Sequence, residues 1–287
     1  MYSSGSLPPG LIGYWSLDGD GTDHGPNGLD GAVGNAAWSA GVSNLALRLD
    51  GTDALFVADT PILEPTLVSI LAWVRPTEYC VTCIEPRVVV NKEDTYEFGM
   101  LPSNGALKSA MSPCWRWWGE TRLPLHEWTA IAVVYDGFNT LHYLSAGLAE
   151  QQVCDGGGDL IRNTATGRSS DFKIGGRDSA SAGATFVGDL DEVMLFDRPL
   201  SSSSIAGLNA LVQRAQVGIQ GSAVSARVRP PQPACNPPAI RLQRPIGTTA
   251  PLIAAHGSRA GRLRCSVRGR TAGRAGRVLA AGRVRKG

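Results

Sequence analysis

The sequence predicts an all-β protein: a sandwich of two antiparallel sheets, followed by one short helix and a basic tail. Three observations support this prediction. Short apolar stretches alternate with Gly, Asp, Asn and Pro, as in β-sandwiches. Helical periodicity is almost absent before Ser201. From Val217 onward the chain has 13 arginines, one lysine and no acidic residue, whereas the part before it carries a net charge of −12.

Eleven stretches have the length and composition of strands. One of them, residues 127–136, is apolar on both faces, because its residues alternate between two directions and both sets are largely hydrophobic. We therefore expect it near the centre of a sheet that is covered on both sides. The predicted strands are 11–17, 45–51, 54–59, 67–76, 87–93, 95–101, 105–112, 127–136, 140–147, 171–176 and 190–196.

A short helix closes the predicted domain. Ser201 can cap it, and Ile205, Leu208 and Leu211 follow at three-residue spacing. We expect residues 1–9 to be a flexible N-terminus, residues 10–215 to form the domain, and residues 216–287 to be a disordered tail. Clustered arginines attract phosphate or anionic lipid by charge. Because no aromatic residue lies among them, we expect no specific nucleic-acid recognition.

Cysteine usage and hydropathy bear on the compartment. Cys80, Cys83, Cys114 and Cys154 can form two disulfides in any of three connectivities, which would indicate an oxidising compartment. Free thiols and a zinc site at the C-x-x-C of Cys80 and Cys83 are the alternatives, but no second C-x-x-C follows. No apolar run is long enough for a membrane span, and the first residues lack the features of a signal peptide.

Four blocks of the chain resemble the laminin-G-like, concanavalin A-like lectin/glucanase jelly-roll domains. The blocks are "LIGYWSLDGDGTDHGPNGLDGAV", "LALRLDGTDALFVAD" with "SILAWVRP", "RLPLHEWTAIAVVYDG", and "FKIGGRD" with "FVGDLDEVMLFDRPLSSSSI". They occur in the family's order over residues 10–211. The resemblance implies a two-sheet jelly roll whose last strand lies beside its first, and a recognition function outside the cytoplasm.

The chain departs from this family on the outward face of the last strand. Polar residues are usual there, but this chain has Met194 and Phe196. Extra apolar cover is expected from the terminal helix or from the loop at residues 79–86. A contact with a neighbouring domain is the alternative.

The acidic run "GDLDEV" raises the question of catalysis, because glycoside hydrolases use two carboxylates 5–10 Å apart. By alternation Asp189 and Asp191 share a face of the strand, and Val193 takes the next position where a second acid would be needed. No H-E-x-x-H or G-x-S-x-G motif is present. The histidines are isolated and are predicted to lie in loops or at the surface. We therefore expect no enzymatic activity.

A structural calcium ion is a better use for these carboxylates. Calcium takes six to eight oxygen ligands, and aspartates crowd the glycine-rich loop after the first strand. The resemblance would bring that loop close to the "GDLDEV" block. We predict a site formed by Asp18, Asp23, Asn27 and Asp191. The alternative is that these residues form Asx turns or are solvated acids.

The segment "CWRWW" is the candidate for binding a sugar, because exposed aromatic rings stack on pyranose rings. In an extended strand Trp115 and Trp117 share a face and Trp118 takes the other, so at least one is expected at a surface or cleft. The sequence thus predicts a non-catalytic domain that binds a glycan or a protein surface of the cell exterior. A structural or adhesive module without a small ligand is the alternative, and a glycoside hydrolase or lyase ranks below both.

Overall fold

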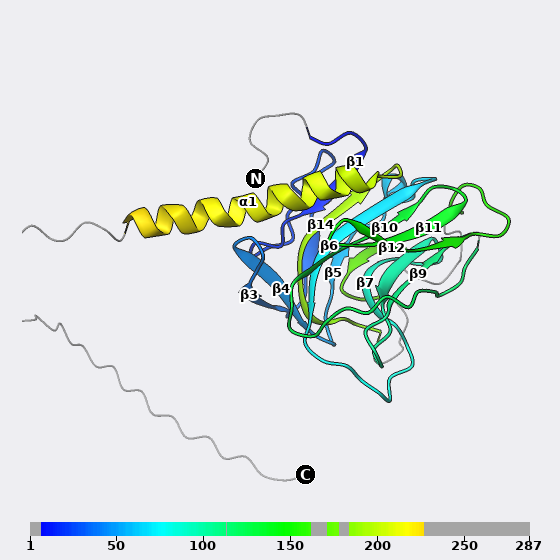
Figure 1. Cartoon of the computed structure of the whole chain (residues 1–287), viewed down its shortest axis with the longest axis horizontal. Coiled ribbons are helices and arrows are strands. Elements are labelled where there is room, and N and C mark those ends of the chain that lie inside the picture. The colour runs from blue at the N-terminus through cyan, green and yellow to red at the C-terminus, as the bar shows by residue number, and fades with distance from the viewer. Residues whose placement is uncertain (1–6, 113, 162–170, 178–183, 227–287) are drawn as a thin grey trace, which may run out of the picture. The chain divides into compact units, whose positions relative to one another are not determined.

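The computed structural model describes residues 7–112, 114–161, 171–177 and 184–226, and it shows two antiparallel sheets and a helix (Figure 1). The larger sheet has the order β12-β11-β10-β6-β14-β4-β3, and β1 also pairs with β14. Its strands are β1 (Leu11–Trp15), β3 (Ala37–Ala40), β4 (Leu45–Asp50), β6 (Val68–Pro76), β10 (Thr129–Tyr135), β11 (Asn139–Leu144), β12 (Gly147–Val153) and β14 (Val187–Phe196).

The smaller sheet has the order β2-β5-β13-β7-β8-β9. Its strands are β2 (Gly31–Val33), β5 (Leu55–Val57), β7 (Arg87–Lys92), β8 (Tyr96–Met100), β9 (Leu107–Met111) and β13 (Phe172–Ile174). The predicted sandwich and all eleven predicted strands are confirmed. Three strands, β2, β3 and β12, were not predicted. The first two have only three and four residues, and β12 is mostly exposed, so none shows the alternation that marks a half-buried strand.

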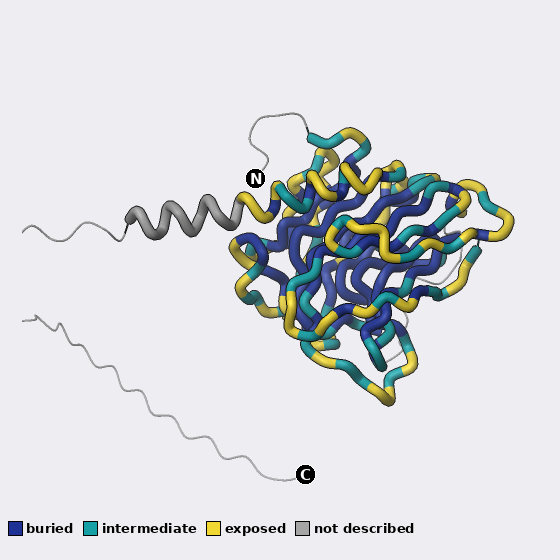
Figure 2. The backbone as a smooth tube through the Cα atoms, in the orientation of Figure 1, coloured by how far each residue is buried: buried dark blue, intermediate teal, exposed yellow. Residues whose placement is uncertain are grey.

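The main hydrophobic core lies between the two sheets, where Figure 2 shows buried strands surrounded by exposed loops. The prediction for residues 127–136 is confirmed. Ile131, Val133 and Tyr135 enter this core, whereas Ala130, Ala132 and Val134 belong to a second cluster on the outer face of the larger sheet.

Helix α1 (Ser202–Ala226) supplies the cover for that outer face. Ser201 caps it, because its Oγ accepts a hydrogen bond from the Ser204 N–H at 3.2 Å. Three helix residues pack on the sheet at a helical spacing, namely Ile205, Leu208 and Val212. Leu211 was predicted for this face but is 47% exposed, because the next residue, Val212, takes the buried position on the helix.

The helix also continues past residue 215, where the sequence placed the end of the domain. The disordered tail was predicted for residues 216–287, of which residues 227–287 lie outside the described part of the chain, as do Cys235, Cys265 and His256. No helix within the described ranges combines the length and hydropathy of a membrane span.

Two disulfides join the four cysteines of the domain, Cys80 to Cys83 and Cys114 to Cys154. This confirms the disulfide prediction and selects one of the three connectivities that the sequence left open. The first bond closes a loop of four residues between β6 and β7, whereas the second joins residues 40 apart.

Strand β14 lies at the centre of the larger sheet. It pairs with β6 on one side, and on the other side with β4 along its first half and with β1 along its second. The expected adjacency of the first and last strands is therefore confirmed. A bulge at Glu192, whose φ is 54°, shifts the register between Asp191 and Met194.

The bulge corrects the predicted facing of Val193. Simple alternation places Val193 on the face of Asp189 and Asp191, but the extra residue turns it into the core between the sheets. Met194 and Phe196 consequently face outward, as predicted, and pack in the cluster that α1 covers.

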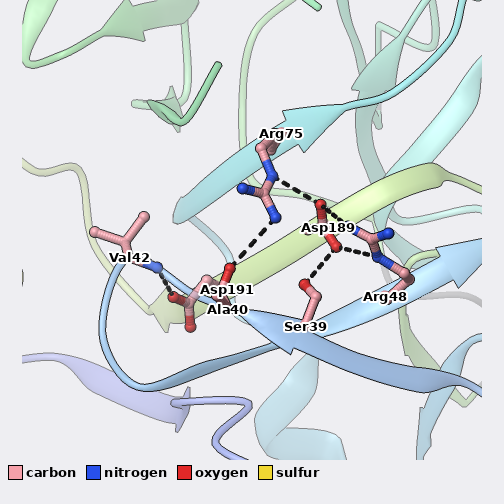
Figure 3. A network of polar contacts seen from close by, with 7 residues as sticks. All are labelled: Ser39, Ala40, Val42, Arg48, Arg75, Asp189 and Asp191. Carbon is pink, nitrogen blue, oxygen red and sulfur yellow. Dashed lines mark hydrogen bonds and ion pairs between the residues drawn. The ribbon is translucent and has the colours of Figure 1, made fainter. Parts of the chain in front are cut away.

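Asp189 links three strands of the larger sheet (Figure 3). Its side chain is fully buried and accepts hydrogen bonds from Arg48 on β4, Arg75 on β6 and Ser39 on β3, at 2.6–3.1 Å. Burial by itself would raise the pKa of Asp189. The bonds from Arg48, Ser39 and Arg75 outweigh it and lower that pKa below its ordinary value.

Asp191, two residues on, has a different environment. Its Oδ2 accepts the backbone N–H groups of Val42 and Ser43, but its buried Oδ1 has no hydrogen-bond partner in the described part of the chain. Burial and the neighbouring carboxyl of Glu192 raise the pKa of Asp191 to about 9. Burial also raises the pKa of Glu192 to about 7, although the Tyr14 hydroxyl donates a hydrogen bond to it.

The two aspartates should respond differently to loss of charge. We expect Asp189→Asn to lower the free energy of unfolding at pH 7 by about 2 kcal/mol. This loss is smaller than that expected on breaking a fully buried ion pair, because the Arg48 side chain is 47% exposed. Asp191→Asn should stay within about 1 kcal/mol of the wild type, since an amide resembles the protonated acid and keeps both N–H bonds. Urea unfolding measures both, and equal losses would contradict this assignment.

The raised pKa values also predict how stability depends on pH. Burial also raises the pKa of a third carboxyl, that of Glu97, to about 7. Asp191, Glu192 and Glu97 therefore hold their protons more tightly in the folded chain than in the unfolded one. Their contribution is complete below about pH 4 and is lost as the pH rises through 7 and then 9. We expect the unfolding free energy to fall by a few kcal/mol, on the order of 3, between pH 5 and pH 9. Urea unfolding at pH 5, 7 and 9 tests this; a rise across the range would refute it.

Candidate functional site

Two of the four predicted calcium ligands organise the loop after β1 instead of pointing to a common centre. The Asp23 carboxylate accepts the backbone N–H groups of Tyr14, Gly25 and Leu29 at 2.7–2.8 Å. The Asn27 side chain donates to the Ile12 carbonyl at 2.7 Å. These are the bonds of an Asx turn and a loop brace, which was the alternative reading of these residues.

The other two predicted ligands bind other backbone groups. Asp18 accepts the Leu45 N–H and the Asn44 side chain at 3.0 Å each, and Asp191 accepts Val42 and Ser43. Within the described ranges, no group of three or more His, Cys, Asp or Glu side chains has a geometry that could hold a metal ion. Calcium binding at these four residues therefore gains no geometric support and stays a prediction.

Residues 114–121, called the tryptophan segment below, follow β9 along the edge of the smaller sheet. The sequence reading treated this segment as an extended strand, but it is not a regular strand. Trp118 and Arg122 form only isolated bridges, with Ser109 and Ala106 respectively. Trp115 is 40% exposed, and Trp117 and Trp118 are half-buried. The expectation that at least one tryptophan reaches the surface is thus met by Trp115.

Trp118 stacks on the ring of His142, with the ring centroids 4.3 Å apart and the planes 8° from parallel. His142 lies on β11 and is fully buried, so the prediction of a loop or surface position is wrong for this histidine. Its Nε2 lies 2.7 Å from the Ser109 Oγ, and its Nδ1 lies 3.1 Å from the Glu150 Oε1. Burial lowers the pKa of His142, which favours the neutral ring.

Glu150, on β12, joins this histidine to the tryptophan segment. Its carboxylate accepts the backbone N–H groups of Glu120 and Thr121 at 2.9–3.2 Å as well as His142. Burial would raise the pKa of Glu150, but the bonds from Glu120, His142 and Thr121 lower it below its ordinary value. The ionised carboxylate therefore fixes both the imidazole and the backbone that carries Trp118.

Ser109, His142 and Glu150 have the connectivity of a nucleophile, base and acid in serine hydrolases. Access argues against that role. Ser109 and His142 are both 0% exposed, and the Ser109 N–H and carbonyl are bonded to Trp118 at 3.3 Å. A nucleophile must reach its substrate, so we interpret this network as support for the Trp118 ring.

A cavity of about 230 Å³ lies beside Trp118, between the edges of the two sheets. The cavity with its lining residues is called the Trp118 cleft below. Gln152 in its wall has a buried Oε1 atom with no hydrogen-bond partner among the described residues. The cleft is lined by Met111, Cys114, Arg116, Trp118, Thr140, Gln152, Val153, Cys154 and Asp155.

Of the three predicted tryptophans, Trp118 alone lines this cleft. The sequence reading missed Arg116, Thr140, Gln152 and Asp155. Thr140 and Gln152 lie opposite each other on β11 and β12, and β12 was not predicted. Arg116 could have been found, because it lies inside the tryptophan segment.

A family model described as the concanavalin A-like lectin/glucanases superfamily matches residues 49–206, more than half of the chain. No curated protein sequence matches the chain.

Several solved structures share the fold at low sequence identity. Domain 4 of AbnA, a GH43 extracellular arabinanase from Geobacillus stearothermophilus in complex with arabinotriose, is 20% identical, with a TM-score of 0.53 and coverage of 69% of this chain and 97% of that one. The binding domain of Paraclostridial Mosquitocidal Protein 1 is 14% identical, with a TM-score of 0.57 and coverage of 69% and 51%.

Trypanosoma rangeli sialidase in complex with sialic acid is 18% identical, with a TM-score of 0.51 and coverage of 69% and 32%. The chain thus spans about half of the toxin binding domain and a third of the sialidase. These likenesses show a common fold. The family model that matches residues 49–206 shows that the chain belongs to the concanavalin A-like lectin/glucanases superfamily.

Proposed function

We propose that the protein is a non-catalytic carbohydrate-recognition domain and that the Trp118 cleft binds the sugar. The observation that carries this proposal is the fixed ring of Trp118, which stacks on His142 and borders the cavity. An aromatic ring of fixed orientation offers a surface on which the C–H face of a pyranose or furanose can stack. Because the ring is held before the ligand arrives, little conformational entropy is lost on binding.

Polar groups around the ring suit the hydroxyls of a sugar. Gln152 has a buried Oε1 atom without a hydrogen-bond partner among the described residues, and a ligand hydroxyl or amide N–H would satisfy it once the side chain turns into the cavity. Arg116, Thr140 and Asp155 add donors and acceptors along the same walls. A few placed polar groups beside an apolar surface are typical of small-ligand sites. The bound arabinotriose of the arabinanase domain supports an oligosaccharide as the ligand class.

Binding of a protein surface is the second candidate. It is favoured by large apolar side chains that are exposed near the Cys114–Cys154 disulfide: Trp115 is 40% exposed, Phe138 69% and Val153 62%. Exposed aromatic residues are common anchors of protein interfaces. The named binding domain of the mosquitocidal protein is consistent with either ligand.

The proposed compartment is extracellular or at the cell surface. Two disulfides support it, because such bonds persist in oxidising compartments and are rare in the cytosol. The arabinanase whose domain shares the fold is itself extracellular.

The proposal predicts that Trp118→Ala weakens glycan binding at least about tenfold, because the stacking surface is lost. Trp115→Ala is the matched control: it removes an exposed tryptophan of the same segment that does not line the cleft. A glycan array that includes arabinotriose and sialylated glycans identifies a ligand, and calorimetric titration of that ligand measures the loss. Trp118→Phe should keep much of the affinity, since it keeps an aromatic face.

Two results would overturn the proposal. One is a glycan array without binding by the folded wild-type chain. The other is equal loss of affinity in Trp115→Ala and Trp118→Ala, which would place the ligand elsewhere on the segment. A clean array together with binding of a purified protein partner that Trp115→Ala or Phe138→Ala abolishes would instead support the second candidate.

A further inference from the structure

The Trp118 cleft shares its wall with a disulfide. Cys114 begins the tryptophan segment, Cys154 follows β12, and both side chains line the cavity. We infer that the cleft forms only while the Cys114–Cys154 bond is closed, so that ligand binding is under redox control. This inference rests on the proposed function for the identity of the ligand, but not for the structural effect of the bond.

The two halves of the tryptophan segment are attached differently. Residues 118–121 are hydrogen-bonded to β9 and to Glu150. Residues 114–117 make no hydrogen bond or ion pair with any described residue, although Cys114 packs against the core between the sheets. Among the described residues, the disulfide is therefore the only bond that holds the first half, which carries Arg116, against the opposite wall of the cleft.

The sandwich does not depend on this bond to the same degree. The strands between the two cysteines are hydrogen-bonded within the larger sheet: β10 pairs with β6 and β11, and β11 pairs with β12. β6 in turn pairs with β14. Opening the disulfide removes the covalent link between the tryptophan segment and the end of β12, and leaves these ladders in place.

The chemistry of opening is thiol–disulfide exchange. A thiolate of a dithiol reductant attacks one sulfur, forming a mixed disulfide and releasing the other cysteine as a thiolate that takes up a proton. The second thiol of the reductant then displaces the first cysteine. The reductant becomes a cyclic disulfide, and the protein gains two thiols. Cys114 is half-buried beside the cavity whereas Cys154 is 5% exposed, so we expect the reductant to attack at Cys114.

The chain contains its own control. The Cys80–Cys83 bond lies in another loop and does not line the cleft. The double variants Cys114→Ser with Cys154→Ser, and Cys80→Ser with Cys83→Ser, each remove one disulfide of the same domain. Any difference in ligand binding between the two double variants therefore depends on which disulfide is lost, since each variant lacks one.

The experiment compares the oxidised chain, the chain reduced with dithiothreitol and both double variants. Binding to the glycan that the array identifies should weaken at least about tenfold on reduction and in the Cys114/Cys154 variant, and stay unchanged in the Cys80/Cys83 variant. Amide hydrogen exchange of Trp118, Glu120 and Thr121, whose N–H groups are hydrogen-bonded to Ser109 and Glu150, should speed up in the same two samples, while β6 and β14 keep their protection.

Equal binding and equal exchange in the oxidised chain and the Cys114/Cys154 variant would overturn the inference. So would loss of protection in β6 and β14, because the bond would then support the whole sandwich. If the oxidised chain binds no glycan, the proposed function fails and exchange alone decides. Faster exchange confined to Trp118, Glu120 and Thr121 supports redox control of the cleft, and unchanged exchange refutes it.

Discussion

The bulge at Glu192 is the constraint on which the arrangement of the larger sheet depends. Before it, Asp189 and Asp191 face outward and Leu190 faces the core; after it, Val193 faces the core and Met194 faces outward. Without the extra residue, the two halves of β14 could not both place polar and apolar side chains where their neighbours need them. One central strand thereby offers its carboxylate to two arginines at one end and an apolar surface to α1 at the other.

Helix α1 covers part of the outer face of the larger sheet. α1 buries the outer face around β14, β6 and β10. Within the described ranges no helix covers β12 in this way, and that strand is mostly exposed. The tryptophan segment approaches this edge from the other sheet and is held by Glu150 and one disulfide. Local stability is lowest where few buried contacts hold the backbone, and binding loops are commonly drawn from such regions.

How much the sequence predicts follows from the range of the interactions involved. Strand patterns and the Ser201 cap are local, and both were predicted. The bulge is not local: nothing in "DLDEV" distinguishes regular alternation from an extra residue until β1 and β6 pair with it. The same holds for the calcium ligands, since Asp23 has the right chemistry but its oxygens accept the N–H groups of Tyr14 on β1 and of Gly25 and Leu29 in its own loop. The cleft was found only through its tryptophan, because its polar residues come from separate parts of the chain: Gln152 lies on β12, a strand without a pattern, and Thr140 lies on β11.

The Ser109, His142 and Glu150 network shows why connectivity alone does not define an active site. The three side chains are joined in the order that acyl transfer requires, yet the serine and histidine have no exposed surface and Trp118 covers the imidazole. In a buried site a neutral imidazole between a hydroxyl and a carboxylate satisfies every polar atom, which is what a core needs. The same three residues orient an aromatic ring at the surface, and a fixed ring with an open cavity beside it favours binding over bond cleavage.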